Sequence, residues 1–339
     1  MKAWRLEKIV ALADDHQPLR LREIDRPEPG PGQVLIKVSA CGVCHTELDE
    51  IEGRAAPPRL PVTPGHQAVG RVVAGDRFPF GTRVGVAWIF RSCGHCSYCR
   101  SGLENLCPDF SGTGRDADGG YAEFMVAHED FVYPIPSGLD DLHAAPLLCA
   151  GAVGWRAVKL SQLQDGQPLG LSGFGASGHL VLQMVRAVFP NSPIYVFTRR
   201  PEQQRLALKL GALWVGDFDT LPPEPLAAVI DTTPAWKPVL HSLSAIAPGG
   251  RLVINAIAKE NADRELLATL DYRLQLWQEK SIKSVANVTR ADVAECLQLA
   301  ERKKVLPQVE VYPFSEANRA LGTLSRGKAR GAMVLKVEE

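Results

Sequence analysis

Residues 169–188 read LGLSGFGASGHLVLQMVRAV, which combines a short apolar run, a glycine-rich centre and an amphipathic segment. The apolar run 169–171 predicts a buried strand, and the periodicity of 179–188 predicts a helix. A further apolar run at 194–197 predicts the next strand, which makes a strand–helix–strand unit. This region therefore indicates a parallel sheet covered by helices.

The glycines at its centre follow the spacing G-x-G-x-x-G and are Gly173, Gly175 and Gly178. Glycine permits a tight turn and a close approach of the backbone to a pyrophosphate, whose charge the N-terminus of the next helix attracts. A glycine turn without a ligand is the alternative interpretation, because the motif alone is weak evidence. The strand before it and the helix and strand after it favour a dinucleotide site with these glycines as cofactor contacts.

The end of the second predicted strand indicates which dinucleotide is bound. NAD-binding sheets place an acidic residue there to bind the ribose hydroxyls, whereas this chain has Thr198, Arg199 and Arg200. No carboxylate would repel a 2′-phosphate, and the two arginines could bind one. We therefore expect these three residues to contact an NAD(P) cofactor with a preference for NADP. The alternative is that the arginines only form a solvated helix start.

The pattern of predicted strands and helices changes near Cys149, which divides the chain into two predicted domains. Before that point, β-like runs at 34–38, 68–73 and 84–89 lie between turn residues and predict an all-β unit. After it, strands and helices alternate. Helices are predicted at 179–188, 201–210, 239–246 and 291–303, and strands at 169–171, 194–197, 227–230, 251–254, 309–311 and 332–337. The predicted domains are 1–148, completed by 289–339, and 149–288.

The composition narrows the classes of function. A chain of 339 residues with 45% hydrophobic content can form two cores. Lys+Arg 38 balances Asp+Glu 38, so no global field attracts nucleic acid or an anionic membrane. No uncharged run approaches the roughly 20 residues that span a bilayer, and the first residues carry no secretory signal. We expect a cytoplasmic protein whose partner is a small molecule, and in that reducing compartment its eight cysteines favour thiols over disulfides.

Four cysteines form the pattern C-x2-C-x2-C-x7-C, namely Cys93, Cys96, Cys99 and Cys107. Four thiolates this close in sequence can bind tetrahedral zinc, and a closed four-sulfur site is structural because it leaves no position for a substrate. Unliganded core thiols, a redox Cys-x-x-Cys and an iron–sulfur cluster are the alternatives, and the cluster is the most serious of them. The spacing predicts a structural zinc.

Three further residues lie in motifs that are weak when taken singly: Cys44 in GVCHTE, His66 in PGHQAVG and Cys149 in LLCAG. Together with the four-cysteine pattern, in this order and over nearly the whole chain, they resemble the zinc-dependent alcohol dehydrogenases of the medium-chain dehydrogenase/reductase superfamily. The resemblance implies an α/β protein with an all-β part, in which a GroES-like β-barrel catalytic domain joins a Rossmann doubly wound parallel sheet.

The same resemblance implies an NAD(P)-dependent alcohol dehydrogenase that holds two zinc ions per subunit. Cys44, His66 and Cys149 would bind the catalytic zinc and leave its fourth position to water or to the substrate oxygen, which is how zinc acts as a Lewis acid. Thr46 matches the hydroxyl that accepts the alcohol proton, and His45 the residue that touches the cofactor pyrophosphate. Their alternatives are an ordinary turn threonine and a solvated loop histidine.

Three positions near the ligands depart from the family pattern. Glu47 stands where the family has Asp and is expected to orient His66. Gln67 replaces the usual Glu, which removes a negative charge near the metal and is expected to make the zinc a stronger electrophile. Asp49 occupies the position where many relatives carry a relay histidine, so either Asp49 or water takes the proton to solvent.

The substrate and the assembly are less closely specified. Trp88 lies at a position that lines the alcohol pocket in relatives, although a core aromatic is an equal alternative. Small Ala55 and Ala56 leave room for primary, or secondary, alcohols and aldehydes, and the family implies a homodimer or homotetramer. The rival functions are a zinc-free quinone or enone reductase of the same superfamily and, from another class, a zinc-ribbon nucleic-acid-binding protein.

Overall fold

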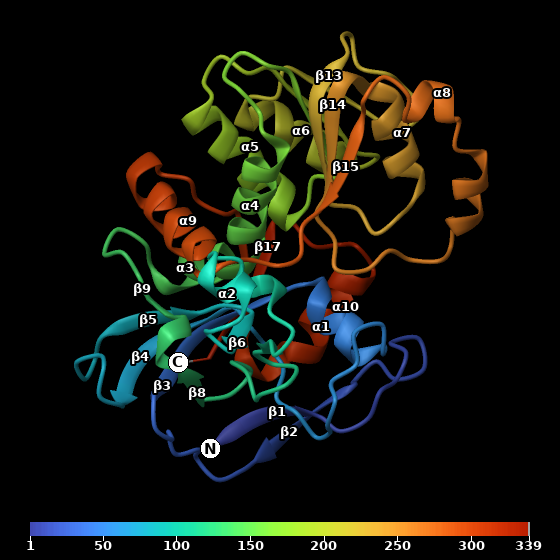
Figure 1. Cartoon of the computed structure of the whole chain (residues 1–339). Coiled ribbons are helices and arrows are strands. Elements are labelled where there is room, and N and C mark those ends of the chain that lie inside the picture. Colours follow the sequence, from blue (N-terminus) through green and yellow to red (C-terminus); the bar gives the residue numbers. More distant parts are fainter. Residues whose placement is uncertain (338–339) are drawn as a thin grey trace. The chain divides into compact units, whose positions relative to one another are not determined.

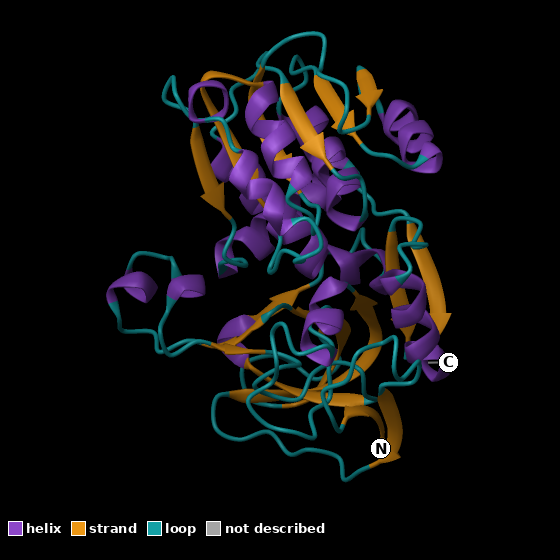
Figure 2. Ribbon diagram, turned by 90° about the vertical axis from the view of Figure 1, so that its right-hand side faces the viewer, coloured by secondary structure: helices purple, strands orange, loops and turns teal. Residues whose placement is uncertain are grey.

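The computed structural model describes residues 1–337 and divides into two compact units (Figures 1 and 2). The first unit comprises Met1–Ala152 together with the chain from Asn287 onward, and the second comprises Val153–Ala286. Within the described residues, no helix combines the length and the apolar character that crossing a membrane requires.

The first unit is built around a long strand, β3 (Gln33–Val43). Three strands pair with it in antiparallel fashion, and one of them, β17, comes from the end of the chain. The sheet has the order β16-β17-β3-β4-β5-β9, with β8 also paired to β3. Apolar side chains from β3, β4 and β17 form one core with the helices α1 and α10. The final segment of the chain is therefore part of this core.

The strands of this unit are β1 (Lys2–Leu6), β2 (Leu19–Glu23), β3, β4 (Ala68–Ala74), β5 (Arg83–Val86), β6 (Ile89–Arg91), β7 (Ser111–Gly112), β8 (Phe124–His128), β9 (Val132–Pro134), β16 (Val309–Pro313) and β17 (Ala332–Lys336). Its helices are α1 (His45–Ile51), α2 (Ser97–Arg100), α3 (Asp141–Pro146), α9 (Arg290–Lys303) and α10 (Ala317–Ser325). Short turns of helix lie at Glu104–Leu106, Glu129–Phe131, Leu147–Gly151 and Phe314–Glu316, the third of them a π-helix.

One strand prediction in this unit is wrong. The apolar run 84–89 does not form a single strand, because β5 ends at Val86 and β6 begins at Ile89. The two pieces join different sheets: β5 pairs with β4 and β9, whereas β6 pairs with β7. A continuous run of apolar residues cannot show this break, since Ala87 and Trp88 are themselves buried.

The second unit is a six-stranded parallel sheet in the order β12-β11-β10-β13-β14-β15. Its strands carry apolar side chains on both faces, as sheets covered on both sides do. In β11, Ile194 and Val196 pack in one core with α4, α5 and α6, and Tyr195 and Phe197 pack in another with α7. The sheet is therefore doubly wound, as predicted, and Figure 1 shows these helices with its strands.

The strands of this unit are β10 (Leu169–Ser172), β11 (Ile194–Phe197), β12 (Trp214–Gly216), β13 (Leu226–Asp231), β14 (Ile246–Ile254) and β15 (Ser281–Ser284). Its helices are α4 (Ala152–Ser161, which begins at the last residue of the first unit), α5 (Ala176–Val188), α6 (Pro201–Leu210), α7 (Lys237–Ala245) and α8 (Tyr272–Gln275), with a 3-10 helix at Arg264–Thr269. Helix α6 has the predicted bounds because Pro201 suits the first turn and Gly211 adopts the left-handed conformation that ends a helix, with φ 100°.

Candidate metal centre and cofactor site

Cys44 lies at the N-cap of α1, immediately after the long strand β3. Its Sγ accepts a hydrogen bond from the backbone N–H of Thr46 at 3.4 Å, and its own backbone N–H donates to Glu47 Oε2 at 2.8 Å. This reciprocal arrangement is a capping box in which a thiol takes the place of the usual hydroxyl. The start of the helix therefore fixes the position of the sulfur.

His66 precedes β4 and is almost completely buried. Glu47 Oε1 lies 2.7 Å from His66 Nδ1, so the same carboxylate that binds the Cys44 backbone also orients this imidazole. Burial alone would lower the pKa of His66, but Glu47 and the Cys44 sulfur raise it well above its usual range. The other ring nitrogen, Nε2, faces Cys44 Sγ at 3.5 Å.

Cys149 lies in the π-helical turn Leu147–Gly151, which follows α3. This turn packs against α9, where Cys296 Sγ donates to the carbonyl of Leu147 at 3.7 Å. The wider π turn is a local feature that is often found at functional sites. It presents Cys149 to the other two residues, so that the ligand atoms of Cys44, His66 and Cys149 all lie within 4.8 Å of one another.

These three residues, which we call the three-ligand cluster, fit a zinc ion. Two sulfurs and one imidazole are donors that zinc prefers, and three protein ligands leave one coordination position open. The hydrogen bond with Cys149, together with burial, raises the pKa of the Cys44 thiol well above its usual range. A bound divalent cation would reverse this effect, because it favours the thiolate.

Cys93, Cys96, Cys99 and Cys107 form a second group, the four-sulfur cluster, whose sulfur atoms also lie within 4.8 Å of one another. Backbone N–H groups of the same loop donate to three of these sulfurs at 3.3–3.5 Å. N–H groups of His95 and Cys96 lower the pKa of Cys93 to about 6, whereas burial raises that of Cys107 to about 11. Four sulfurs with oriented N–H donors fit a closed structural zinc site.

The other predicted catalytic residues lie on α1 next to Cys44. His45 is exposed and Thr46 is half-buried. Asp49 is buried, and its Oδ1 accepts from Arg54 Nε at 2.5 Å. Burial raises the pKa of Asp49, although Arg54 acts in the opposite direction. Arg54 belongs to none of the sequence motifs, and its ion pair with Asp49 bears on any relay through that carboxylate.

Trp88 has the surroundings of a core aromatic, one of the two interpretations that the sequence left open. Its ring is buried and stacks on Phe110 in a small core with Ile89 and Phe131. The same ring lies edge-on to His66, with the centroids 5.0 Å apart. A core aromatic is therefore also in contact with a residue of the three-ligand cluster.

Glu50 is a feature that sequence reasoning missed. Its side chain is buried, and within residues 1–337 neither carboxyl oxygen has a hydrogen-bond partner. Burial and the neighbouring charge of Glu47 raise the pKa of Glu50 well above its usual range, while His66 opposes them. Glu50 is thus one of three buried carboxyl groups on α1, with Glu47 and Asp49. Only the spacing of three residues from Glu47, which places both on one helix face, could have suggested it.

The glycine-rich turn has the geometry that its motif predicts. Gly173 has φ +84°, and a Cβ there would lie 2.8 Å from Thr232 Oγ1. A Cβ on Gly178 would lie 2.6 Å from the carbonyl of Gly173, so this glycine allows close packing of helix on strand. A Cβ on Gly175 would meet nothing within 4 Å, and α5 begins at the next residue without a side-chain cap. The N-terminus of α5 is thereby left open to a phosphate.

Thr198, at the end of β11, is buried, and its hydroxyl donates to Gln203 Oε1 at 2.5 Å. Gln204 Nε2 in turn donates to the Thr198 carbonyl at 2.8 Å. Arg199 and Arg200 are both exposed, directly before α6. Thr198 therefore holds the start of α6 through Gln203 and Gln204. The two arginine side chains remain exposed to solvent.

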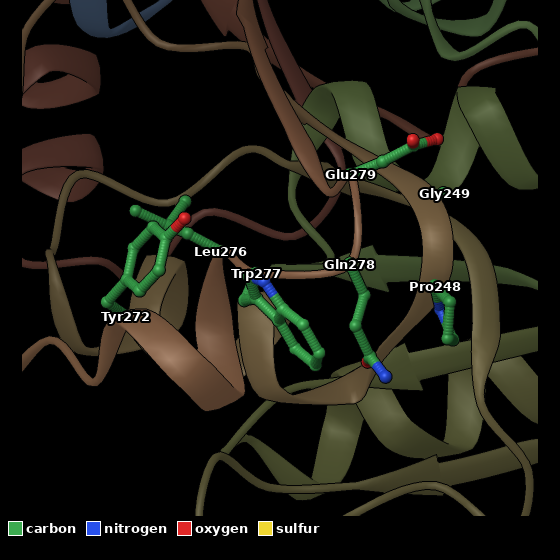
Figure 3. A pocket seen from close by; sticks show the side chains of 7 residues that line it. All are labelled: Pro248, Gly249, Tyr272, Leu276, Trp277, Gln278 and Glu279. Atoms are coloured by element: carbon green, nitrogen blue, oxygen red, sulfur yellow. The ribbon is translucent and has the colours of Figure 1, made fainter.

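A broad pocket of about 800 Å³ lies elsewhere in the second unit (Figure 3). Its lining contains neither Cys nor His and consists of Pro248, Gly249, Tyr272, Leu276, Trp277, Gln278 and Glu279. Tyr272 and Trp277 are more than half exposed. The one carboxylate in this lining, Glu279, cannot bind zinc without further donors, so the pocket does not compete with the three-ligand cluster as the reactive centre.

Comparison with known proteins gives the family. Residues 30–137 match the alcohol dehydrogenase GroES-like domain, and residues 215–335 match the zinc-binding dehydrogenase family. A "Probable alcohol dehydrogenase" from Mycobacterium tuberculosis is 40% identical to this chain, and the match covers 99% of this chain and 97% of the relative. The chain belongs to the medium-chain alcohol dehydrogenases. The predicted family, the fold class and the prediction of an enzyme are thus confirmed.

Two further relatives agree with this medium-chain alcohol dehydrogenase assignment. An alcohol dehydrogenase from Geobacillus stearothermophilus is 34% identical, with 98% of this chain and 99% of the relative covered. The crystal structure of an alcohol dehydrogenase from the archaeon Aeropyrum pernix is 26% identical and superposes with a TM-score of 0.85, over 99% of this chain and all of that chain. The GroES-like β unit and the Rossmann unit are therefore both features of the family.

Proposed function

We propose that this medium-chain dehydrogenase is a zinc-dependent alcohol dehydrogenase that passes hydride between a primary, or secondary, alcohol and NAD(P). The observation that carries the proposal is the three-ligand cluster of Cys44, His66 and Cys149, within 4.8 Å of one another. A zinc-free quinone or enone reductase needs no such donor set. A zinc-ribbon nucleic-acid-binding protein needs a basic surface, whereas this chain has a net charge of +0.

Each residue near the cluster has a task in this proposal. When bound, zinc supplies Lewis acidity that favours loss of the alcohol proton near neutral pH. Cys44, His66 and Cys149 hold the ion, and Glu47 keeps His66 in the orientation that presents Nε2. Trp88 lies edge-on to His66 at 5.0 Å and forms a wall of the alcohol pocket in this proposal, with small Ala55 and Ala56 leaving room beside it.

The proton leaves through Thr46 in the first step of the proposed relay. Its hydroxyl belongs to the residue whose backbone N–H donates to Cys44 Sγ, which supports its place beside the cluster. Asp49 is the proposed next acceptor, and its ion pair with Arg54 stabilises the charged form. His45 is exposed and is assigned to the cofactor pyrophosphate.

We further propose that NADP is preferred over NAD. Gly173, Gly175 and Gly178 cradle the pyrophosphate at the N-terminus of α5. The exposed Arg199 and Arg200 bind the 2′-phosphate, and no carboxylate stands at the end of β11 to repel it. The four-sulfur cluster adds a second zinc per subunit, with a structural role.

The protein is proposed to act as a homodimer or homotetramer in the cytoplasm. Strand β15 forms one edge of the parallel sheet. Ile282 lies on this strand and Trp277 lies four residues before it, and both side chains are exposed. With the pocket shown in Figure 3, they offer apolar surface for a second copy. Within residues 1–337 no disulfide joins any of the eight cysteines, which agrees with a reducing compartment.

An initial-rate screen tests the proposal. Primary and secondary alcohols and their carbonyl products are assayed with NAD and NADP at equal subsaturating concentrations, before and after chelation and after zinc is restored. We expect turnover that is lost on chelation, returns with zinc and is faster with NADP. Turnover that survives complete removal of zinc would overturn the function, and faster turnover with NAD would overturn only the cofactor preference.

A further inference from the structure

A buried ion pair lies at the carboxyl end of β13 and takes no part in the chemistry described so far. Asp231, the last residue of β13, is completely buried, and Lys259, in the segment after β14, is within ion-pairing distance of it with a side chain only 8% exposed. Burying two charges is costly unless further hydrogen bonds satisfy both of them. The surroundings of each charge therefore show what the pair holds in place.

The ammonium of Lys259 is fully satisfied. Besides Asp231, it donates to the backbone carbonyls of Thr233 at 2.6 Å and Ala235 at 3.2 Å. Next to it, the N–H of Glu260 donates to the carbonyl of Pro234 at 2.8 Å. Lysine has three N–H donors, and all of them are used. Lys259 thereby ties the segment after β14 to the segment after β13.

The carboxylate of Asp231 extends the same network toward the glycine-rich turn. Its Oδ1 accepts from Ser172 Oγ at 2.7 Å and from Thr233 Oγ1 at 2.8 Å. The N–H of Thr232 donates to the Ser172 carbonyl at 2.8 Å. Ser172 directly precedes Gly173, whose missing Cβ would lie 2.8 Å from Thr232 Oγ1. The network therefore packs directly against Gly173, the first glycine of the cofactor turn.

The position of this network in the sheet gives it a functional meaning. The strand order reverses between β10 and β13, and sheets of this type bind dinucleotides at that point, beyond the carboxyl ends of the strands. The half built from β10 to β12 takes the adenosine, and the half built from β13 to β15 takes the nicotinamide. The segments that Lys259 ties together follow β13 and β14, so they belong to the nicotinamide half.

We propose that Asp231 and Lys259 are positioning residues that fix the segments after β13 and β14 in the shape that receives the nicotinamide half of the cofactor. Neither residue needs to touch the cofactor, because the ammonium and the carboxylate are both engaged by protein groups. The inference rests on the proposed function, since it requires a bound dinucleotide. The competing explanation is that the pair only stabilises the fold.

Separate measurement of the two halves of the cofactor distinguishes these explanations. Dissociation constants are measured for reduced dinucleotide, by its fluorescence, and for adenosine diphosphate or its 2′-phosphate form, by calorimetry. The variants are Lys259→Met, the double variant Asp231→Asn/Lys259→Met, which leaves no unpaired buried charge, and Lys259→Arg, which keeps the charge. Lys237→Met is the matched control, because Lys237 pairs with Asp219 in the same unit with both side chains exposed.

We expect Lys259→Met and the double variant to weaken binding of the reduced dinucleotide about tenfold and binding of the adenosine ligand less than about twofold. The emission shift of the bound nicotinamide should shrink in both, and Lys259→Arg should restore most of the affinity. Lys237→Met should change neither constant. Wild-type protein that binds no dinucleotide would defeat the proposed function itself, before any variant is compared.

With a wild type that binds, three results would overturn the inference alone. The first is equal weakening for both ligands, and the second is unchanged binding in folded Lys259→Met protein. The third is that all three variants fail to fold, as judged by circular dichroism, since the pair would then serve the whole unit. Lys259→Met alone leaves the buried charge of Asp231 unpaired, and this could weaken both ligands equally by destabilising the unit. The double variant removes that charge as well, so equal weakening in the double variant cannot have this cause.

Discussion

The two clusters of candidate metal ligands in the first unit are assembled in different ways. The four-sulfur cluster takes all its ligands from one loop, 93–107, and the N–H groups of that loop donate to its sulfurs. The three-ligand cluster brings together residues 44, 66 and 149, which lie on three separate elements. A local cluster can close around an ion by itself, whereas a dispersed one depends on the fold and, with three protein ligands, keeps a position for chemistry.

Replacement of Cys44 by Ser should have the largest effect. The variant should lose one zinc per chain and at least about a thousandfold in kcat/KM, because the Lewis acid is lost, while the fold is retained. Metal analysis and initial rates with one alcohol measure both changes. Thr269→Ala is the control, since this residue of the second unit belongs to neither cluster and its hydroxyl donates to the carbonyl of Leu266, and its zinc content and rate should stay near wild type. A fully active Cys44→Ser enzyme would contradict the assignment.

Replacement of Cys96 by Ser should act on stability instead. The loop should lose its zinc, and the free energy of unfolding should fall by about 3 kcal/mol or more, because binding of a structural ion contributes directly to folding. Urea unfolding with parallel metal analysis measures this. Ser97→Ala, in the same loop, should unfold like wild type. If Cys96→Ser instead abolished turnover without loss of stability, the two clusters would have exchanged roles.

Replacement of Glu47 by Gln sharpens the contrast between the clusters, because this carboxylate serves only the three-ligand cluster. Zinc affinity there should fall about 10- to 100-fold, as is usual when a group that orients a ligand histidine is removed. Competition with a chromophoric chelator measures the affinity of each cluster, and that of the four-sulfur cluster should not change. Glu52→Gln, the same change at the end of α1, is the control. Equal weakening of both clusters would count against the assigned contact.

The thiols of the metal-free protein should differ in their pH dependence. Backbone N–H groups lower the pKa of Cys93 to about 6, whereas the hydrogen bond with Cys149 and burial raise that of Cys44. A thiolate is the reactive form, so alkylation of Cys93 should be fast at pH 7 and slow about tenfold by pH 5, while Cys44 stays slow at both. Mass-spectrometric mapping after brief iodoacetamide treatment gives both rates. Equal labelling of the two cysteines would remove this distinction.

The sequence predicted those parts of the molecule whose signals are local. The glycine-rich turn gave the parallel sheet, and the bounds of α6 followed from Pro201 and Gly211. The spacing of Cys93 to Cys107 was enough for a local cluster. In contrast, the break between β5 and β6 depends on which strands pair with each piece, and a continuous apolar run carries no information about pairing.

Around the three-ligand cluster, the sequence predicted the residues that lie in motifs but not the contacts that depend on the fold. The motifs located Cys44, His66 and Cys149, and the role expected of Glu47 agrees with its 2.7 Å contact with His66. The partner of Asp49, the burial of Glu50 and the link from Lys259 to Asp231 did not follow, because each depends on contacts that only the folded chain creates. The hydrogen bond from Thr198 to Gln203 is likewise a contact that no motif encodes.

Cobalt spectroscopy gives the most direct test of the central claim, that one of the two clusters has an exchangeable position and the other does not. Metal-free protein is loaded with Co²⁺, and the visible d–d absorption is followed while an alcohol is added. We predict that the bands lost in Cys44→Ser shift with the alcohol, and that the bands lost in Cys96→Ser do not. A spectrum in which the alcohol leaves the Cys44-dependent bands unchanged, or shifts the Cys96-dependent ones, would contradict the account.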